Sequence, residues 1–168
     1  MNRFLLIVVI FLSLSDLQAQ EQYSTSSKRA ARALQEALKQ YRIREYDAAL
    51  EKITDALKRD KKFVEAYIVR GQVYEAKKNP AQALESYQRA IYLNSNIFPK
   101  VLYSAGLLSL EMGQYQEARE YFNRYIDKPG TGPIFREKAR KQLRSCRFAL
   151  KQLNNPVPFK PENLGKSI

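Results

Sequence analysis

The fold is decided by a stretch in the middle of the chain, Lys78-Asn79-Pro80-Ala81-Gln82-Ala83-Leu84. Two other stretches align with it: Arg44-Glu45-Tyr46-Asp47-Ala48-Ala49-Leu50 and Gly113-Gln114-Tyr115-Gln116-Glu117-Ala118-Arg119. Three columns of residues then keep steps of 34 and 35 residues: Ala49, Ala83 and Ala118; Ile53, Tyr87 and Phe122; and Ala37, Gly71 and Gly106. Columns that share one period indicate an internal repeat.

Each repeat is predicted to contain two helices. In the second repeat Tyr67, Gly71 and Tyr74 follow one another at spacings of four and three, which places them on one helix face. Asn79 is the predicted N-cap of the next helix, with Pro80 at its first position. The small residues predict a close approach of the two helices, with Gly71 facing Ala83. The other repeats are expected to form helices over residues 27–41, 46–59, 99–112 and 115–126.

This pattern resembles the tetratricopeptide repeat (TPR) over residues 28–127. The positions that carry the resemblance are Tyr67, Gly71, Tyr74, Ala83, Tyr87 and Ala90 in the second repeat, and Leu102, Gly106, Gly113, Tyr115, Ala118 and Phe122 in the third. The chain departs from the family pattern at Arg70, Ser95 and Tyr125, and the first repeat has Ala33 and Ala37 at the aromatic and Gly positions, as an end repeat can. The resemblance implies an all-α, TPR-like α-solenoid with repeats at about 28–62, 63–97 and 98–128.

A further helix is predicted over residues 134–153, after the break at 128–133. Its apolar stripe is Phe135, Ala139, Leu143, Cys146 and Leu150. It resembles the capping helix of TPR arrays, which would complete a TPR domain at 28–153. Because Cys146 lies on the stripe, it is interpreted as a small buried residue rather than a reactive thiol. The prolines within 154–168 predict an extended linker or tail.

Composition argues against catalysis. The 168 residues include no His, one Cys and six Gly, so His-based relays, His-ligated metals and Cys-rich metal sites cannot be built. We therefore predict no enzyme activity and no catalytic, cofactor-binding or metal-binding residue. Carboxylate pairs on one helix face, such as Glu51 and Asp55, are interpreted as ordinary solvated groups.

The formal net charge of +12 is unevenly distributed. Residues 63–127 carry seven charges of each sign, whereas residues 128–168 carry ten positive and two negative charges. On the last predicted helix a basic stripe lies beside the apolar one: Arg136, Arg140, Arg144, Arg147 and Lys151. It is either a solvated face or a docking surface for an acidic protein or an anionic envelope polymer.

The N-terminus has the pattern of a secretory signal peptide. Arg3 precedes an apolar run from Phe4 to Leu14, and a more polar stretch ends at Ala19. We predict a signal peptide at 1–19, a short extension at 20–27, and no transmembrane helix in the mature chain; a buried N-terminal helix is the alternative. Export makes nucleic acid an unfavoured partner for the positive charge.

The TPR resemblance also implies a binding groove along the first helix of each repeat. The corresponding positions are Leu34, Leu38, Tyr41, Ile68, Gln72, Glu75, Lys100, Tyr103, Leu107 and Leu110. Leu38 and Gln72 occupy positions where TPR domains that clamp a carboxyl terminus have Asn, which favours an apolar segment, extended or helical, as the ligand. The alternative is that several of these residues pack on the capping helix.

The tail adds a resemblance of its own. Residues 158–165 resemble the stretch that joins an N-terminal TPR region to a β-propeller in certain Gram-negative envelope proteins, which end in an OmpA-like, peptidoglycan-binding domain. Some of those proteins serve type IX secretion and gliding. This implies a periplasmic scaffold that binds a protein partner near the outer membrane. The alternative is a direct binder of peptidoglycan or lipopolysaccharide through the basic helix.

Overall fold

The computed structural model describes residues 23–94 and 96–155. Within these residues the chain forms seven helices and no strand, which confirms the predicted all-α solenoid. The helices are α2 (Lys28–Arg42), α3 (Tyr46–Arg59), α4 (Val64–Ala76), α5 (Pro80–Leu93), α6 (Pro99–Glu111), α7 (Tyr115–Asp127) and α8 (Pro133–Asn154). The predicted signal peptide and the tail from residue 156 lie outside the described residues.

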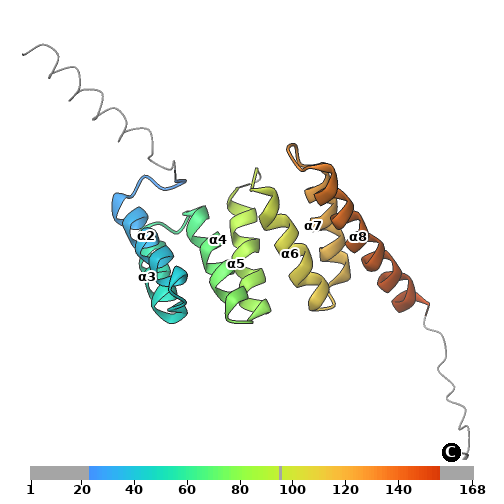
Figure 1. Ribbon diagram of the computed structural model, residues 1–168, viewed down its shortest axis with the longest axis horizontal. Helices are drawn as coiled ribbons and strands as arrows, with labels where there is room; N and C mark the ends of the chain where they lie inside the picture. Colours follow the sequence, from blue (N-terminus) through green and yellow to red (C-terminus); the bar gives the residue numbers. More distant parts are fainter. Residues whose placement is uncertain (1–22, 95, 156–168) are drawn as a thin grey trace, which may run out of the picture.

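The helices stand side by side in one row (Figure 1). α2 pairs with α3, α4 with α5 and α6 with α7, and each pair then packs on the next. α8 packs on α7 and closes the row at its C-terminal end, so it occupies the place expected of the capping helix. The predicted helix limits agree with the observed ones to within about one residue at each end.

The same turn joins the two helices of every pair. Arg44, Lys78 and Gly113 occupy equivalent positions, and their φ angles are 66°, 55° and 73°. The next residue then donates its backbone N–H to a carbonyl five residues earlier, at 2.8–2.9 Å in all three turns. These bonds satisfy carbonyls that the helix end leaves without a partner.

Local signals set the start of α5 as predicted. Asn79 is the N-cap, its side chain accepts a hydrogen bond from the backbone N–H of Gln82 at 3.2 Å, and Pro80 is the first helical residue. α4 starts differently, because its N-cap Phe63 offers no side-chain acceptor. There Ser24 of the N-terminal extension accepts from the backbone N–H of Val64 at 2.9 Å, so the extension caps the second repeat.

Close packing inside each pair involves glycine and an aromatic ring. A Cβ on Gly71 would lie within 3 Å of three ring atoms of Tyr87, and one on Gly106 would lie 2.8–3.0 Å from the ring of Phe122. Gly71 was expected to face Ala83, and the atoms nearest to it belong to the Tyr87 ring, four residues further along α5. The small residue admits the ring as well as the neighbouring helix.

The buried stripe of α8 is shorter than predicted. Ala139, Leu143 and Cys146 are buried against the last repeat, and Leu150 is partly exposed. Phe135, in the first turn of the helix, is exposed instead, and the Lys138 ammonium lies 5.6 Å from its ring centroid. Burial raises the pKa of the Cys146 thiol, which confirms its interpretation as a small buried residue.

Candidate functional site: a cleft along the first helices of the repeats

A cleft of about 690 Å³ opens along the first helices of the three repeats. Its lining comes from α2, α4, the start of α6 and one residue of α5: Tyr41, Ile68, Gln72, Glu75, Ala76, Tyr87, Phe98, Lys100, Val101 and Ser104. On α4 the four contributing residues are spaced by four, three and one, which is a single face of the helix. The repeat architecture therefore aligns side chains from distant parts of the sequence on one surface.

The cleft combines an apolar surface with a few fixed polar groups. The Tyr87 hydroxyl donates a hydrogen bond to the Glu75 carboxylate. Burial, and secondly this bond to Glu75, raise the pKa of Tyr87, so the phenol stays protonated and the carboxylate keeps its position. Lys100 adds a positive charge on the α6 side. The arrangement combines an apolar surface with a few fixed polar groups, as small binding sites do.

Phe98 is the most exposed apolar side chain in the cleft. It is the N-cap residue of α6, directly before Pro99, and 64% of its surface is exposed. Contact between water and an apolar ring is unfavourable. Covering the Phe98 ring with a ligand would therefore contribute about 2 kcal/mol to the free energy of binding. Phe98 is therefore the residue in the cleft that gains most from a bound partner.

Half of the predicted groove residues meet in this cleft. Tyr41, Ile68, Gln72, Glu75 and Lys100 line it together. The other five positions do not contribute to its lining: four of them pack into the repeat cores and one is exposed elsewhere.

Leu34 is buried in the core of the first repeat, and Leu38 packs against the same core. Tyr103 and Leu110 pack against the core of the later repeats, where the Tyr103 ring lies 5.7 Å from Phe122 and 5.1 Å from Tyr125. Leu107 is exposed but lies outside the cleft lining.

Sequence reasoning missed the other half of the lining: Ala76, Tyr87, Phe98, Val101 and Ser104. Tyr87 belongs to a repeat column rather than to the groove positions; it is buried in the core and also lines the cleft. Phe98 precedes the helix whose face was analysed. Its signal in the sequence is a large apolar residue directly before the proline that opens the helix.

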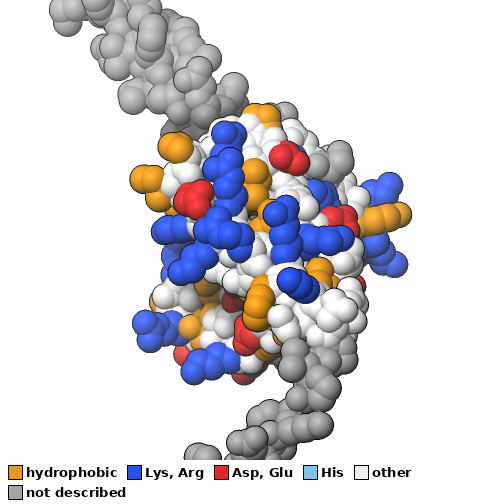
Figure 2. Space-filling model, turned by 90° about the vertical axis from the view of Figure 1, so that its right-hand side faces the viewer, with side chains coloured by type: hydrophobic (Ala, Val, Ile, Leu, Met, Phe, Trp, Pro, Cys, Tyr) orange, Lys and Arg blue, Asp and Glu red, His pale blue; other side chains and the backbone are white. Residues whose placement is uncertain are grey.

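The basic stripe of α8 divides into a partly buried residue and an exposed part. The Arg136 guanidinium is partly buried; its Nη2 donates to the Lys128 carbonyl at 3.5 Å, and its Nε has no hydrogen-bond partner among the described residues. Arg140 and Arg144 are exposed and share Glu137, at 3.6 and 3.3 Å. Figure 2 shows Lys and Arg side chains gathered over this end of the array, with few acidic ones.

Two structural tests bear on other kinds of site. Within residues 23–94 and 96–155, no group of three or more His, Cys, Asp or Glu side chains lies together as metal ligands would. None of the described helices combines the length and the apolar character that crossing a bilayer requires.

Two family models match the chain, and both describe the tetratricopeptide repeat. One covers residues 34–96 and the other residues 99–127, so together they span more than half of the sequence. The chain is a tetratricopeptide repeat protein. The repeat pattern, the paired helices and the closing helix described above are therefore those of its family.

Solved TPR structures share the fold at low sequence identity. One is the first TPR of Spaghetti (RPAP3) bound to the HSP90 peptide SRMEEVD, with 20% identity, a TM-score of 0.64, and coverage of 76% of this chain and 97% of that one. Another is the Yersinia enterocolitica type III secretion chaperone SycD in complex with a peptide of the translocator YopD, with 18% identity, a TM-score of 0.62, and coverage of 73% and 95%.

Among curated proteins, the TPR chain is similar to the photosystem I assembly protein Ycf3 of Cuscuta gronovii and of Cuscuta obtusiflora. Each match is 29% identical over 65 residues, which is 38% of this chain. The matched part spans about two-fifths of the length of these relatives, at 39%.

Proposed function

We propose that this TPR protein is a non-catalytic scaffold that binds a segment of a partner protein in the cleft along α2, α4 and α6. The observation that carries the proposal is the exposed Phe98 beside Tyr41 and Val101, in a cleft that crosses all three repeats. The peptide complexes named for two TPR domains of similar fold support this use of the surface.

The cleft also indicates the chemistry of the bound segment. Its aromatic and aliphatic lining suits one or two large apolar side chains, while Gln72 and Ser104 can bond the polar backbone of an extended or helical segment. Glu75 and Lys100 carry opposite charges, so the lining has no net preference for a charged ligand. An apolar anchor with a polar backbone fits better than a terminal carboxylate.

We further propose that the protein is exported and works in the bacterial cell envelope, on the periplasmic side of the outer membrane. The signal-peptide pattern of residues 1–19 and the resemblance of residues 158–165 to linkers of envelope proteins, including those of type IX secretion, support this location. Mass spectrometry of the protein from the producing cell tests it. A mature chain that begins at Gln20 is expected, and a chain that retains Met1 or Asn2 would contradict export through cleavage.

Binding in the cleft is tested by selecting ligands from a random peptide library and measuring their affinities. Phe98→Ala is expected to weaken a selected apolar peptide about tenfold or more, because it removes the exposed ring that the ligand covers. Phe148→Ala is a matched control, since Phe148 on α8 is 65% exposed, as Phe98 is 64%, and lies outside the cleft lining. Equal losses in the two variants would contradict the proposal.

A second candidate function rests on the exposed arginines of α8. Arg140, Arg144, Arg147 and Lys151 suit an anionic polymer such as peptidoglycan or lipopolysaccharide. Binding of isolated polymer that falls steeply with salt, and is lost in the Arg140→Glu, Arg144→Glu double variant, would favour it. Unchanged binding by that variant would exclude the helix as the binding surface.

A further inference from the structure

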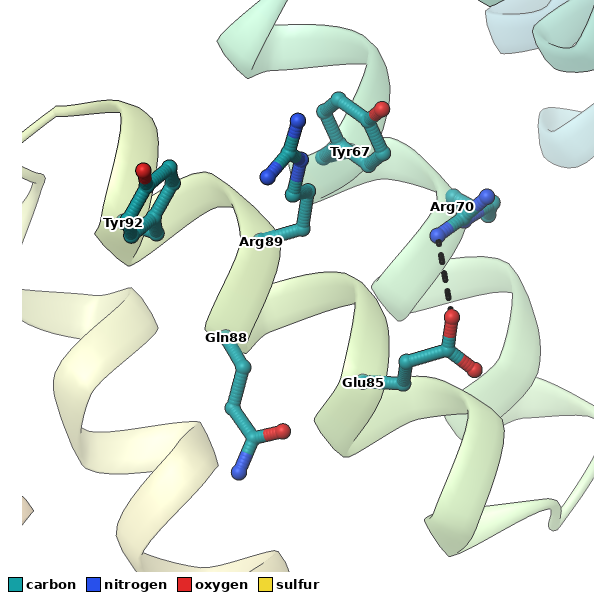
Figure 3. Close-up of a pocket in the computed structure, with 6 residues that line it drawn as sticks. All are labelled: Tyr67, Arg70, Glu85, Gln88, Arg89 and Tyr92. Atoms are coloured by element: carbon teal, nitrogen blue, oxygen red, sulfur yellow. Dashed lines mark ion pairs between the residues drawn. The ribbon is translucent and has the colours of Figure 1, made fainter.

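We propose that the second repeat carries a separate site for a single carboxylate, supplied by an acidic side chain of a partner protein. The site is a shallow pocket of about 430 Å³ between α4 and α5, lined by Tyr67, Arg70, Glu85, Gln88, Arg89 and Tyr92 (Figure 3). It shares no lining residue with the cleft. Since residues advance by about 100° along a helix, Arg70 lies on the opposite side of α4 from Gln72 and Glu75.

Arg70 is held ready for a ligand by three neighbours. Its Nε donates to the Ser86 hydroxyl at 2.9 Å, its guanidinium carbon lies 4.9 Å from the centroid of the Tyr67 ring, and its Nη2 lies 4.0 Å from Glu85. Ser86 is fully buried and itself donates to the Gln82 carbonyl at 2.7 Å, so the anchor of the arginine is fixed. The Arg70 side chain is only 25% exposed.

This anchoring leaves part of the guanidinium without a partner. An arginine has five N–H donors, and only the Nε bond of Arg70 is within hydrogen-bond range among the described residues. The remaining donors lie on the two terminal nitrogens, whose spacing matches the two oxygens of a carboxylate. A half-buried guanidinium with free terminal donors is suited to receive an oxyanion.

Arg89 supplies a second positive charge to the pocket. Its guanidinium carbon lies 5.2 Å from the centroid of the exposed Tyr92 ring, and it has no ion pair within the described part of the chain. Figure 3 shows Arg89 extending toward the side of the pocket where Tyr67 lies, while Gln88 points the other way. Two arginines therefore border the same pocket, each beside a tyrosine.

The repeat architecture does not account for Arg70 and Tyr92. The position of Arg70 holds Glu36 in the first repeat and Ala105 in the third, and Ala105 is fully buried. The position of Tyr92 holds Lys58 and Asp127. Tyr67 is the aromatic residue expected of the repeat and packs against the core, so it is the arginine and the second tyrosine that call for a reason other than packing.

The charge of the pocket favours a carboxylate over a phosphate. Arg70 and Arg89 face one carboxylate, that of Glu85, which leaves a single excess positive charge. One carboxylate neutralises it, whereas a doubly charged phosphate would leave excess negative charge next to Glu85. The two tyrosine rings then cover the aliphatic stem of the incoming acidic residue.

The test uses the mature chain and NMR signals of the arginine Nε–H groups. The probes are a blocked pentapeptide with one glutamate between two leucines, its glutamine counterpart, and inorganic phosphate. The glutamate peptide is expected to shift the Arg70 and Arg89 signals, and the glutamine peptide is not. Arg70→Ala and Arg89→Ala should each weaken binding about tenfold, the scale of one charge-assisted hydrogen bond.

Arg124→Ala is the matched control, because Arg124 occupies the position of Arg89 in the third repeat without the two tyrosines. It should leave binding unchanged, and so should the cleft variant Phe98→Ala, which separates this site from the proposed function. Equal shifts by the glutamine peptide, an equal loss in the Arg124 variant, unchanged binding in both pocket variants, or tighter binding of phosphate would each overturn the proposal.

Discussion

At the scale of single residues, two kinds of position decide whether a TPR unit forms. One kind is the glycine that admits an aromatic ring, as Gly71 admits Tyr87 and Gly106 admits Phe122. The other is the turn residue with positive φ, where Arg44, Lys78 and Gly113 are equivalent. The glycines beside aromatic rings report on packing, and the turn residues report on backbone conformation. Each effect can be tested by one substitution.

Gly71→Ala is expected to lower the free energy of unfolding by about 1–2 kcal/mol. A methyl group there would overlap the Tyr87 ring, and overpacking of this kind costs about 1–3 kcal/mol, more than the gain of about 1 kcal/mol from higher helix propensity. Urea denaturation measures the difference. Gly106→Ala should cost less, because its ring contacts are longer. A stabilised Gly71→Ala variant would show that helix propensity, not packing, governs this position.

Gly113→Ala should cost about 1 kcal/mol for a different reason. Nothing lies within 4 Å of the added methyl group, but the φ angle of 73° is unfavourable for any residue with a Cβ. The opposite change, Lys78→Gly at the equivalent turn, should raise stability by up to about 1 kcal/mol. Thermal unfolding of both variants checks the pair, and a shift of the same sign in both would refute the backbone explanation.

The pH dependence of stability should report on Tyr87. Its pKa is raised above the ordinary value of 10.0, first by burial and then by Glu75. Above about pH 10 the unfolded chain loses this proton while the folded chain keeps it. The contribution of Tyr87 to the free energy of unfolding is therefore full below pH 10 and falls as the pH rises. The urea midpoint between pH 9 and 11.5 should therefore fall less steeply in Tyr87→Phe than in the unaltered chain. Parallel profiles would contradict the burial of a protonated phenol.

At the scale of elements, α8 covers the core that the third repeat would otherwise expose. Leu143 is buried together with Phe122 and Tyr125, whereas Phe148 on the same helix is exposed. Leu143→Ala should lower stability by about 2–4 kcal/mol, and Phe148→Ala should change it by less than about 0.5 kcal/mol. Chemical denaturation of the two variants tests whether α8 folds as part of the array. Similar small effects in both would mean that α8 docks only loosely.

The helices could be predicted from the sequence because their signals are local. Asn79 and Pro80 mark the start of α5 independently of what packs around them. The repeat period then predicts where the equivalent helices of the other two repeats begin. The exposed Phe135 shows where such reasoning ends. A stripe of apolar residues gives the direction a helix faces, but how far the neighbouring helix covers it depends on tertiary packing.

The candidate site was predictable only in part for the same reason. Tyr41, Gln72 and Lys100 were found from their positions on the first helices, but Leu34 on the same kind of face is buried. The burial of Leu34 depends on how closely the first two repeats pack, and no local sequence pattern encodes that distance. Phe98 was missed because it precedes its helix, and the Arg70 pocket because it appears in one repeat only.

At the scale of the whole molecule, the TPR array presents three separate surfaces. The cleft carries balanced charge, the pocket of the second repeat has a single excess positive charge, and the exposed arginines lie on α8 at the end of the row. Partners with different chemistry could therefore bind together, which is the property of a scaffold. The central claim is that the cleft holds the protein partner.

Photo-cross-linking in the producing cell tests that claim most directly. A photoreactive amino acid replaces Gln72 in the cleft and, separately, the exposed Gln116 of α7 as a control. The account predicts a partner cross-linked from position 72, lost when Phe98→Ala is added, and none from position 116. A partner captured from position 116 but never from position 72 would contradict it.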